Sequence, residues 1–461
     1  MLNAQKVHFI AIGGYGMSGL AMVLLQQGVR VSGSDVAASE RTKQLEAVGA
    51  EVHIGAHDAA YVEGADLVIY STQVPASNPE MAAAREQGIR IWHRSELLAY
   101  FLNQPGAIAL AGTHGKTTTT SMTALLLEKG GLDPTVLVGG ELKVIGGTGK
   151  AGRGPVVAEA DESDRSFLRY HPTITVITNM EAEHLEHWNG SFEEIKQGFA
   201  QYLSQVVPGG LGIVMGDDPN LRLIGEQAKG VEVVFYGESE ANEWRAVNIR
   251  PHGTGVAYEV LRAGHRLCTI ELPVPGKHNA LNSLAALIVG SRVGLSFAQM
   301  AEAYRSFGNA KRRFQVWAEV NDVVVVDDYA HHPTEVRATL QAAKEREGRR
   351  VVAVFQPQRY SRTHWLMKEF TEAFGDADEL ILTPIYSPPG EPVIPGVTSE
   401  ALAVGIQANT GRPVEVIEAK EAILARLIEI VRPGDTVLTM GAGDIWTVAK
   451  ALAERLQATT V

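Results

Sequence analysis

The stretch ALAGTHGKTTTTSM, residues 109–122, decides how the fold of this chain is read. A short apolar run leads into a turn that contains Gly112 and Gly115, and Lys116 follows with a row of threonines. Backbone donors at a helix start, a lysine and threonine hydroxyls are the groups that hold a nucleoside triphosphate and its magnesium ion. The usual first glycine of such a loop is missing, because Leu110 stands in its place. The stretch therefore predicts a phosphate-binding loop of variant form between a strand and a helix, and the alternative is a chance turn.

The length and composition of the chain are those of a globular protein with several domains. Its 461 residues leave room for about three domains of roughly 150 residues each. The 47 glycines fit a chain of repeated strand, turn and helix units. The formal net charge of -12 argues against a nucleic-acid or membrane-surface binder, since such proteins usually carry a basic field. Any anionic substrate must therefore be held by local basic groups.

Cysteine use and hydropathy indicate a cytoplasmic protein. Cys268 is the single cysteine, which excludes an internal disulfide and a thiolate metal site and fits a reducing compartment. No run reaches the roughly 18 to 20 apolar residues of a membrane span. The apolar segment 1–28 is interrupted by glycines and lacks the pattern of a signal peptide. We therefore expect a folded cytoplasmic protein without membrane insertion.

The chain alternates between strand and helix patterns in three successive series. In the first hundred residues, strand patterns occur at 7–12, 29–35, 64–72 and 88–93, and a helix pattern at 20–28. In the second series they occur at 107–112, 155–160, 174–179, 210–216 and 231–237. In the third they occur at 322–330, 349–356, 378–386, 412–418 and 435–441. Such alternation predicts an α/β protein built from parallel sheets.

Four segments interrupt this alternation. Pro105 and Gly106 form a turn that suits a domain boundary. Residues 139–155 are dense in glycine, and we expect a mobile loop there. Residues 244–276 alternate like antiparallel strands and precede a helix pattern, and residues 306–317 read as a basic connector before the third series.

The turn after the first strand carries Gly14-x-Gly16-x-x-Gly19, and Asp35 ends the second strand. This pattern is typical of a helix N-terminus that approaches a diphosphate. Taken alone it is equally compatible with a tight turn between a strand and a helix, and it does not identify a nucleotide.

Two acidic segments follow strands of the second series. Glu159 ends one strand, and Asp161, Glu162 and Asp164 come directly after it. Carboxylates at the carboxyl end of a strand beside a phosphate loop are expected magnesium ligands. Glu159 is the preferred candidate, because it is the acid that still belongs to the strand. The alternative is a solvated acidic loop.

The second acidic segment, residues 181–187, gathers Glu181, Glu183, His184, Glu186 and His187. A histidine among carboxylates could complete a second magnesium site or cap a helix, and the residues alone leave both interpretations open.

Two loops of the third series carry further candidates. One supplies Asp327, Asp328, Tyr329, His331 and His332, and the other supplies Arg359 and Arg362. Two arginines three positions apart after a strand suit the bidentate capture of a carboxylate or phosphate. The alternative is a pair of solvated surface arginines.

Taken together, these segments resemble the ATP-dependent Mur ligase family of peptidoglycan synthesis over essentially the whole chain. The resemblance rests on motifs that follow one another in a fixed order: GGYGMSG, GTHGKTTTT, EADESDRSF, TNMEAEH, GKHNALN, KRRF, DDYAHHPTE and QPQRYSRT. It implies a Rossmann-like N-terminal domain over 1–103 for a UDP-sugar and a central P-loop ATPase-like domain over 104–310 for ATP. A Rossmann-like C-terminal domain over 311–461 would bind the incoming amino acid.

The resemblance also implies roles for individual residues. The UDP-sugar would be bound by Gly14, Gly16, Met17, Ser18, Gly19, Asp35 and Ser71. ATP would be bound by Gly112, Thr113, His114, Gly115, Lys116, Thr117, Thr118, Asn279, Arg313 and Asp328. Two magnesium ions would be held by Thr117, Glu159 and His184, and the amino acid by His331, Arg359 and Arg362. The catalytic residues would be Lys116, Glu159, His184 and Arg359.

The implied reaction joins L-alanine to the lactyl carboxylate of UDP-N-acetylmuramate. ATP would convert the carboxylate into an acyl phosphate, and the amine would displace phosphate, with the third domain closed to exclude water. The enzyme would act as a monomer or homodimer without nucleic acid. The nearest rival is a recycling ligase that adds a ready-made tripeptide to the same UDP-sugar; a nicotinamide-dependent oxidoreductase and a nucleotide-gated binding protein are more distant.

Three positions depart from the family pattern. Gln358 stands where many relatives have histidine, which puts a histidine contact to alanine from that loop in doubt. Ala330 replaces a common glycine and Glu183 a common aspartate, and both changes are conservative.

Overall fold

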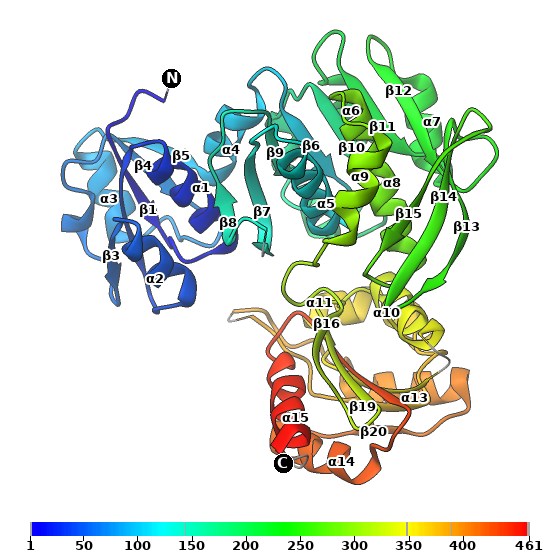
Figure 1. Cartoon of the computed structure of the whole chain (residues 1–461). Helices are drawn as coiled ribbons and strands as arrows, with labels where there is room; N and C mark the ends of the chain where they lie inside the picture. The colour runs from blue at the N-terminus through cyan, green and yellow to red at the C-terminus, as the bar shows by residue number, and fades with distance from the viewer. Residues whose placement is uncertain (1, 143, 347–348, 389, 459–461) are drawn as a thin grey trace. The chain divides into compact units, whose positions relative to one another are not determined.

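The computed structural model describes residues 2–142, 144–346, 349–388 and 390–458. It contains three β-sheets with helices packed on them, in the order in which the sequence alternates (Figure 1). The chain forms two compact units. The first comprises residues 2–248, 258–270 and 281–308, and the second comprises the remaining described residues. Within the described part of the chain, no helix is long and apolar enough to cross a membrane.

The first sheet has five parallel strands in the order β3-β2-β1-β4-β5. Its strands are β1 (Lys6–Ile10), β2 (Arg30–Asp35), β3 (Glu51–Ile54), β4 (Leu67–Tyr70) and β5 (Arg90–His93). Its helices are α1 (Tyr15–Gln26), α2 (Glu40–Ala47), α3 (Pro79–Glu86) and α4 (Arg94–Leu102), with the 3-10 turn η1 (Ala59–Val62). Phe9 packs into the core cluster with α1, and the next residue, Ile10, packs with Met81 of α3 on the other face. The strand order reverses direction between β1 and β4, which is where an open α/β sheet forms a ligand crevice.

The second sheet has ten strands in the order β15-β14-β13-β12-β11-β10-β6-β9-β7-β8. The strands are β6 (Ile108–Ala111), β7 (Thr135–Leu142), β8 (Gly147–Lys150), β9 (Val156–Glu159), β10 (Ile174–Ile177), β11 (Leu211–Met215), β12 (Glu232–Gly237), β13 (Trp244–His252), β14 (Gly255–Arg262) and β15 (His265–Leu272). The helices are α5 (Lys116–Lys129), α6 (Phe192–Ser204), α7 (Pro219–Gln227), α8 (Lys277–Arg292) and α9 (Phe297–Arg305), with the turns η2 (Ser166–Arg169) and η3 (Leu185–His187). The register pairs Leu110 with Glu159 and Ala111 with Ile177, so the loops after β6, β9 and β10 start at one edge of the sheet.

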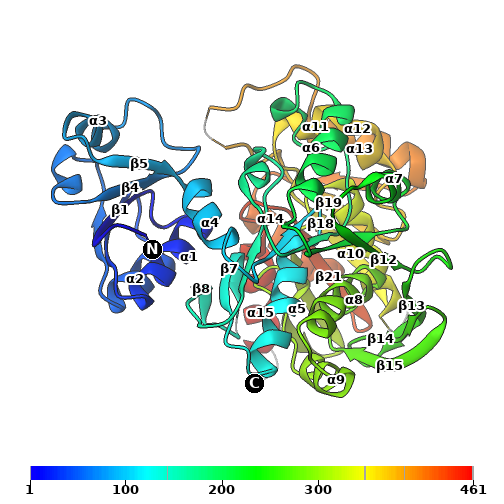
Figure 2. The ribbon, with the colours of Figure 1, turned by 90° about the horizontal axis from the view of Figure 1, so that it is seen from above.

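The prediction of a mobile loop at residues 139–155 is wrong. The segment supplies the end of β7 and all of β8, which form an antiparallel hairpin. Gly149 lies so close to α1 that an added Cβ would stand 2.3 Å from the carbonyl oxygen of Gly19. Figures 1 and 2 both show this hairpin beside α1. The glycines therefore allow close packing of backbones in an ordered element, rather than mobility.

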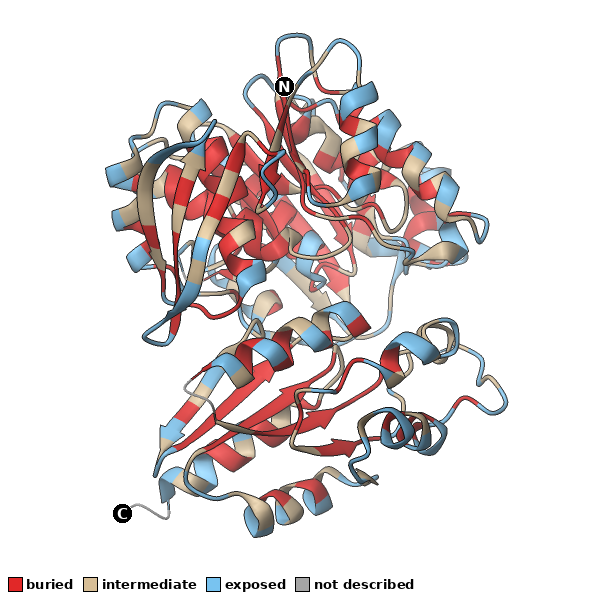
Figure 3. Ribbon diagram, turned by 90° about the vertical axis from the view of Figure 1, so that its right-hand side faces the viewer, coloured by how far each residue is buried: buried red, intermediate tan, exposed pale blue. Residues whose placement is uncertain are grey.

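The third sheet has six strands in the order β16-β17-β21-β18-β19-β20, and all but the edge strand β16 are parallel. The strands are β16 (Gln315–Val320), β17 (Val323–Asp328), β18 (Arg350–Phe355), β19 (Glu379–Leu382), β20 (Val414–Val416) and β21 (Asp435–Met440). The helices are α10 (Pro333–Glu345), α11 (Tyr360–Trp365), α12 (Met367–Thr371), α13 (Ser399–Thr410), α14 (Lys420–Ile430) and α15 (Trp446–Ala458). Alternate residues of β17 pack into separate core clusters on the two faces. Figure 3 shows the buried central strands in red and the exposed outer sides of the helices in blue.

The α/β fold and every strand predicted from an apolar run are confirmed. The sequence analysis missed β3, which is a short edge strand of partly exposed residues, and β16, whose first half lies in the predicted connector. The limits of the three domains remain predictions.

Candidate active site

The first glycine-rich turn joins β1 to α1 and is fixed by two side chains. The Asp35 carboxylate accepts a hydrogen bond from the Gly13 amide at 2.8 Å. Arg41 of α2 donates from Nε to the carbonyl oxygen of the same residue at 2.6 Å. Ala11 has a φ of 63°, which is rare for a residue with a side chain. Asp35, which was predicted to lie beside the UDP-sugar, therefore also shapes this turn. The role of Arg41 in holding the turn was not predicted from the sequence.

The predicted UDP-sugar residues of α1 divide into two groups. Gly14 precedes the helix, and among the described side chains none caps its N-terminus. An added Cβ at Gly16 would meet no described atom within 4 Å. Ser18 and Gly19 lie further along the helix, where Ser18 Oγ lies 3.1 Å from the hydroxyl of Thr148 and Gly19 packs against the Thr148 backbone. Gly14 and Gly16 can approach a ligand closely, whereas Gly19 serves packing.

The two remaining residues of this group also have defined places. Met17 is buried in the core, with 3% of its surface exposed. Ser71 directly follows β4, at the crevice between β1 and β4.

The second glycine-rich turn, between β6 and α5, needs glycine at both of its predicted positions. Gly112 has a φ of 132°, and a Cβ there would stand 2.1 Å from Thr178 Oγ1. Gly115 has a φ of 81° and faces Asn282. Side chains at either position would meet both backbone strain and a collision.

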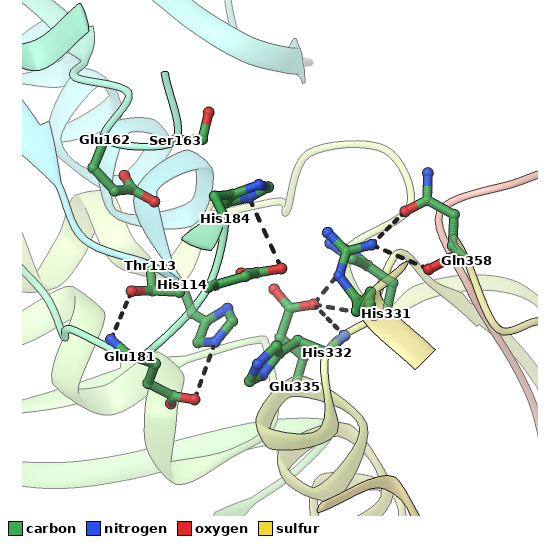
Figure 4. Close-up of polar contacts among 12 residues, drawn as sticks. Thr113, His114, Glu162, Ser163, Glu181, His184, His331, His332, Glu335 and Gln358 are labelled. Carbon is green, nitrogen blue, oxygen red and sulfur yellow. Dashed lines mark hydrogen bonds and ion pairs between the residues drawn. The ribbon is translucent and has the colours of Figure 1, made fainter. Parts of the chain in front are cut away.

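The loop after β10 clamps this turn. Asn179 accepts a hydrogen bond from the His114 amide at 2.7 Å and donates to the His114 carbonyl oxygen at 2.9 Å. Its own carbonyl oxygen accepts from the Thr113 amide at 3.2 Å. The Glu181 amide donates to Thr113 Oγ1 at 2.9 Å (Figure 4). Thr113 and His114 thus shape the loop, and Asn179, missed from sequence, could have been found as the residue that follows the neighbouring strand.

Lys116, the first residue of α5, is held by the acidic segment after β9. Its Nζ donates to both carboxylate oxygens of Glu162, at 2.9 and 2.8 Å, and to the Gly112 carbonyl oxygen at 2.5 Å. Burial disfavours the charged ammonium, but the carboxylates of Glu162 and Asp161 outweigh it and keep the pKa of Lys116 above its ordinary value. The lysine is therefore charged at the start of a helix whose dipole also favours anions.

The first turn of α5 can bind an anion. Gly115 is the N-cap residue, and no described side chain caps this helix. The first amides of an α-helix have no partner within the helix. The hydroxyl-bearing residues Thr117 and Thr118 lie in this turn and are largely buried. Backbone amides, an ammonium and hydroxyls therefore gather as predicted.

Two further residues were predicted to hold magnesium. Glu159 ends β9 and accepts a hydrogen bond from the Gly139 amide at 2.7 Å. His184 is the N-cap residue of η3 with a φ of 54°, and its side chain makes no cap hydrogen bond with that turn. Its imidazole lies 3.9 Å from the carboxylate of Glu183 and 3.8 Å from that of Glu186. A hydrogen bond with His184 lowers the pKa of Glu186 to about 2.

Asn279 was predicted to contact adenine. It lies in the first turn of α8 with 3% of its surface exposed. Its side-chain amide donates to the Pro275 carbonyl oxygen at 2.6 Å. The structure therefore gives it a role in holding the start of α8.

In the second unit, the predicted nucleotide residues lie beside the start of the third sheet. Asp328 accepts hydrogen bonds from the amides of Phe314 and Ala330 at 2.6 and 2.7 Å, and burial raises its pKa to about 6. Arg313 stacks over the Tyr329 ring at 5.3 Å and lies 3.9 Å from Glu335.

Arg312, the residue before Arg313, has a structural role that the sequence analysis did not predict. Arg312 pairs with the buried carboxylate of Asp327 at 3.0 Å. It also donates to the carbonyl oxygens of Gly441 and Gly443 at 2.5 and 2.8 Å. Arg312 thus fixes the loop after β21, whereas Arg313 is placed for another role.

The histidine pair is organised by Glu335. His332 is the N-cap residue of α10, and Glu335 completes a capping box with it. Glu335 also accepts a hydrogen bond from the His331 amide at 3.0 Å (Figure 4). His331 Nδ1 lies 2.9 Å from the Tyr329 carbonyl oxygen. Of the two histidines, His332 is structural and His331 is 16% exposed in its side chain.

The two predicted arginines lie at the start of α11. Arg359 has a φ of 70° and a ψ of 132°, a conformation that residues with side chains rarely adopt. Its amide donates to the Tyr386 carbonyl oxygen at 2.9 Å. Arg362 donates to the side chain of Gln358 at 2.6 Å. Gln358 therefore orients an arginine, which gives a role to the departure noted in the sequence.

Comparisons with known proteins agree with this arrangement. Three family models match in order: the Mur ligase family catalytic domain at residues 6–105, the Mur ligase middle domain at 110–290, and the Mur ligase glutamate ligase domain at 312–443. A UDP-N-acetylmuramate--L-alanine ligase of Symbiobacterium thermophilum is 67% identical over 100% of this chain and 96% of its own length. One of Pelotomaculum thermopropionicum is 46% identical over 99% of both chains.

A solved structure agrees as well. The crystal structure of a UDP-N-acetylmuramate-alanine ligase from Thermotoga maritima is 30% identical, with a TM-score of 0.82 over 98% of this chain and 99% of its own. With matches to all three domains in sequence and structure, the chain belongs to the Mur ligase family.

Proposed function

We propose that this protein is an ATP-dependent ligase that joins L-alanine to the lactyl carboxylate of UDP-N-acetylmuramate in peptidoglycan precursor synthesis. The observation that carries the proposal is the full-length 67% identity to a protein named for that activity. The half-buried Lys116 at the uncapped start of α5 supports the use of ATP. The reaction releases ADP and phosphate, and it takes place in the cytoplasm.

The N-terminal sheet binds the UDP-sugar. Its diphosphate lies at the start of α1, where the first amides of the helix face the turn and Gly14 and Gly16 allow close approach. Asp35 keeps the turn in shape through the Gly13 amide, and Ser71 borders the crevice between β1 and β4. The uncapped helix and the open surface at Gly16 support this role.

The turn between β6 and α5 binds the phosphates of ATP. Lys116 and the first-turn amides neutralise the charge that gathers on the transferred phosphoryl group. The clamp by Asn179 keeps the loop in shape before the substrate arrives, so that little reorganisation is needed during the reaction.

Magnesium would be held by Thr117, Glu159 and His184. A buried threonine hydroxyl and a carboxylate provide the oxygen ligands that this ion prefers, so the first two residues fit it well. The imidazole of His184 fits this ion less well, because magnesium prefers oxygen ligands to nitrogen ligands. When bound, magnesium neutralises phosphate charge and orients ATP for in-line transfer.

The second unit supplies the residues proposed to bind the amino acid and three of those proposed to bind the nucleotide. Arg359 and Arg362 suit the carboxylate of L-alanine, since guanidinium groups bind carboxylates with two parallel hydrogen bonds. The strained backbone of Arg359 supports a functional role for it. His331 orients the amino acid, and Arg313 and Asp328 contribute to the nucleotide site together with Asn279.

The chemistry proceeds in two steps. The lactyl carboxylate attacks the γ-phosphate of ATP, which gives an acyl phosphate and ADP. The amine of L-alanine then attacks the acyl carbon, and phosphate leaves from the tetrahedral intermediate. Water would hydrolyse the acyl phosphate, so closure of the C-terminal domain is part of the proposal.

The test measures phosphate release by the purified protein with magnesium, ATP and UDP-N-acetylmuramate. L-alanine is added to one reaction, and the tripeptide that a recycling ligase would use is added to the other. Phosphate release that requires L-alanine is the expected result. Phosphate release with the tripeptide alone would assign the protein to the recycling reaction. No phosphate release with either acceptor would contradict ligase activity.

A further inference from the structure

The ammonium of Lys116 is held in one place by acceptors from two loops. Both carboxylate oxygens of Glu162 lie within 2.9 Å of Nζ, and the carbonyl oxygens of Gly112 and Thr113 lie at 2.5 and 3.3 Å. An ammonium has three hydrogens to donate, and these acceptors fix where its charge lies. The carboxylate of Glu162 is 7% exposed, so the ion pair is shielded from water. A lysine side chain is otherwise flexible, and this pair restricts it to one orientation.

The loop that carries Glu162 is itself fixed by Arg94. The guanidinium of Arg94 lies 3.0 Å from the Asp164 carboxylate and 3.3 Å from that of Asp161, on both sides of Glu162 in the sequence. Asp161 and Asp164 also each accept a hydrogen bond from the amide two residues further on, at 3.0 Å in both cases. Figure 4 shows Glu162 with its neighbour Ser163 on this loop. The loop therefore has little freedom to move Glu162 away.

Arg94 belongs to a different part of the fold from the phosphate loop. It is the first residue of α4 and directly follows β5, the edge strand of the sheet that binds the UDP-sugar in the proposed function. Electrostatic attraction by Asp161 and Asp164 raises the pKa of Arg94 despite its burial. Two sets of ion pairs therefore meet on the loop of residues 161–164. Arg94 pairs with Asp161 and Asp164, and Lys116 pairs with Glu162 between them. We call this arrangement the ion-pair chain.

From these contacts we propose that Glu162 is a positioning residue for Lys116, and that Arg94 keeps Glu162 in place. The inference rests on the proposed function, in which Lys116 contacts the phosphates of ATP, and it adds a carboxylate and an arginine that this function does not itself require. The ion-pair chain makes the geometry of the ATP site depend on the junction between β5 and α4.

The first test replaces Glu162 by glutamine, which keeps the volume and one acceptor but removes the charge. We expect Glu162→Gln to lower kcat/KM for ATP about 10- to 100-fold, because a charge-assisted hydrogen bond that orients a catalytic group is lost. The affinity for UDP-N-acetylmuramate is expected to stay within about twofold. Glu128→Gln is the matched control, because Glu128 pairs with Lys150 at 2.6 Å on the last turn of α5, and it is expected to leave ATP kinetics unchanged.

A double-mutant cycle separates positioning from a general structural role. Calorimetry measures the Kd for ATP with magnesium in Glu162→Gln, in Lys116→Ala and in the double variant. Because Glu162 acts through the lysine, Glu162→Gln should weaken ATP binding only when Lys116 is present. An equal loss in both backgrounds would overturn the proposal.

Arg94 and folding are tested separately. Arg94→Met should lower kcat/KM for ATP about threefold to tenfold, and Arg94→Lys should restore part of it. If thermal unfolding shows that Glu162→Gln is not folded, Glu162→Asp keeps the charge but withdraws the carboxylate, and it should still raise the KM for ATP. If the wild-type enzyme is active and a folded Glu162 variant has the same kcat/KM for ATP, only this inference is overturned. A wild-type enzyme without alanine-dependent phosphate release would contradict the proposed function instead.

Discussion

The two glycine-rich turns, β1–α1 and β6–α5, have similar sequences but different surroundings. Both follow a buried strand and open a helix whose N-terminus no described side chain caps. The first is held by Asp35 and Arg41 through the backbone of one residue, Gly13, and an added Cβ at Gly16 would meet no described atom within 4 Å. The second is clamped by Asn179, leaves no room for a side chain at Gly112, and carries a half-buried lysine that is paired with a buried carboxylate.

The difference teaches what a glycine pattern contributes by itself. In both turns glycine lets the backbone approach a phosphate, but the charge and the rigidity come from residues outside the pattern. The first turn suits a diphosphate that is bound but does not react. The second suits a phosphoryl group that is transferred and must be stabilised as its charge changes. Four substitutions can break or sharpen this division.

The largest effect is expected for Lys116→Ala. It should lower kcat/KM for ATP about 10³- to 10⁴-fold, because the group that neutralises the transferred phosphate is lost. UDP-sugar affinity, measured by calorimetry, should not change, since the first turn is unaffected. Turnover within tenfold of wild type would break the comparison.

Gly112→Ala should mainly reduce folding stability. The added Cβ would stand 2.1 Å from Thr178 Oγ1 at a φ of 132°. We expect the free energy of unfolding to fall by about 3 kcal/mol, measured by urea titration, through strain and collision together. Gly28→Ala is the control for positive φ without a collision, because no described atom lies within 4 Å of its added Cβ. Equal losses in the two variants would show that the clamp adds nothing.

Gly19→Ala should weaken the packing of α1 on the hairpin. Its Cβ would stand 2.8 Å from the carbonyl oxygen of Thr148. The free energy of unfolding should fall by about 1 to 3 kcal/mol, as for other insertions into packed regions. UDP-sugar affinity, corrected for the folded fraction, should stay the same. A selective loss of UDP-sugar binding would place this glycine in the ligand site instead.

Gly16→Ala should give the smallest effect on stability, and in the opposite direction. A Cβ there meets no described atom within 4 Å, and the position lies in the first turn of α1. The free energy of unfolding should rise by about 0.5 to 1 kcal/mol, because alanine is favoured over glycine in a helix. The affinity for the UDP-sugar should fall about tenfold, since the methyl group blocks the approach of the diphosphate. Unchanged affinity would move the diphosphate away from this turn.

The sequence predicted the strands of the fold well because their apolar runs are local signals. Buried parallel strands such as β6 and β18 consist mainly of apolar residues, and this pattern can be recognised without knowing any distant contact. The hairpin of β7 and β8 was missed because its glycines carry no side-chain pattern. Its order comes from the backbone ladder and from close contact with α1.

The candidate site was predicted less completely, and the reason is again distance in the sequence. Lys116 was found because it follows a strand and a turn within ten residues. Its partner Glu162 and the clamp residue Asn179 lie 46 and more than 60 residues away, and only the order of strands in the sheet brings them to the loop. Arg312 could not be distinguished from Arg313, because its role depends on carbonyl oxygens more than 120 residues away.

The central claim, that an acyl phosphate links ATP to amide formation, is tested most directly by isotope transfer. UDP-N-acetylmuramate labelled with ¹⁸O in its lactyl carboxylate is incubated with ATP, magnesium, L-alanine and the enzyme, and the released phosphate is analysed by mass spectrometry. The account predicts one ¹⁸O atom in each phosphate, because the attacking carboxylate oxygen leaves with the phosphoryl group. Unlabelled phosphate, released in step with amide formation, would contradict it.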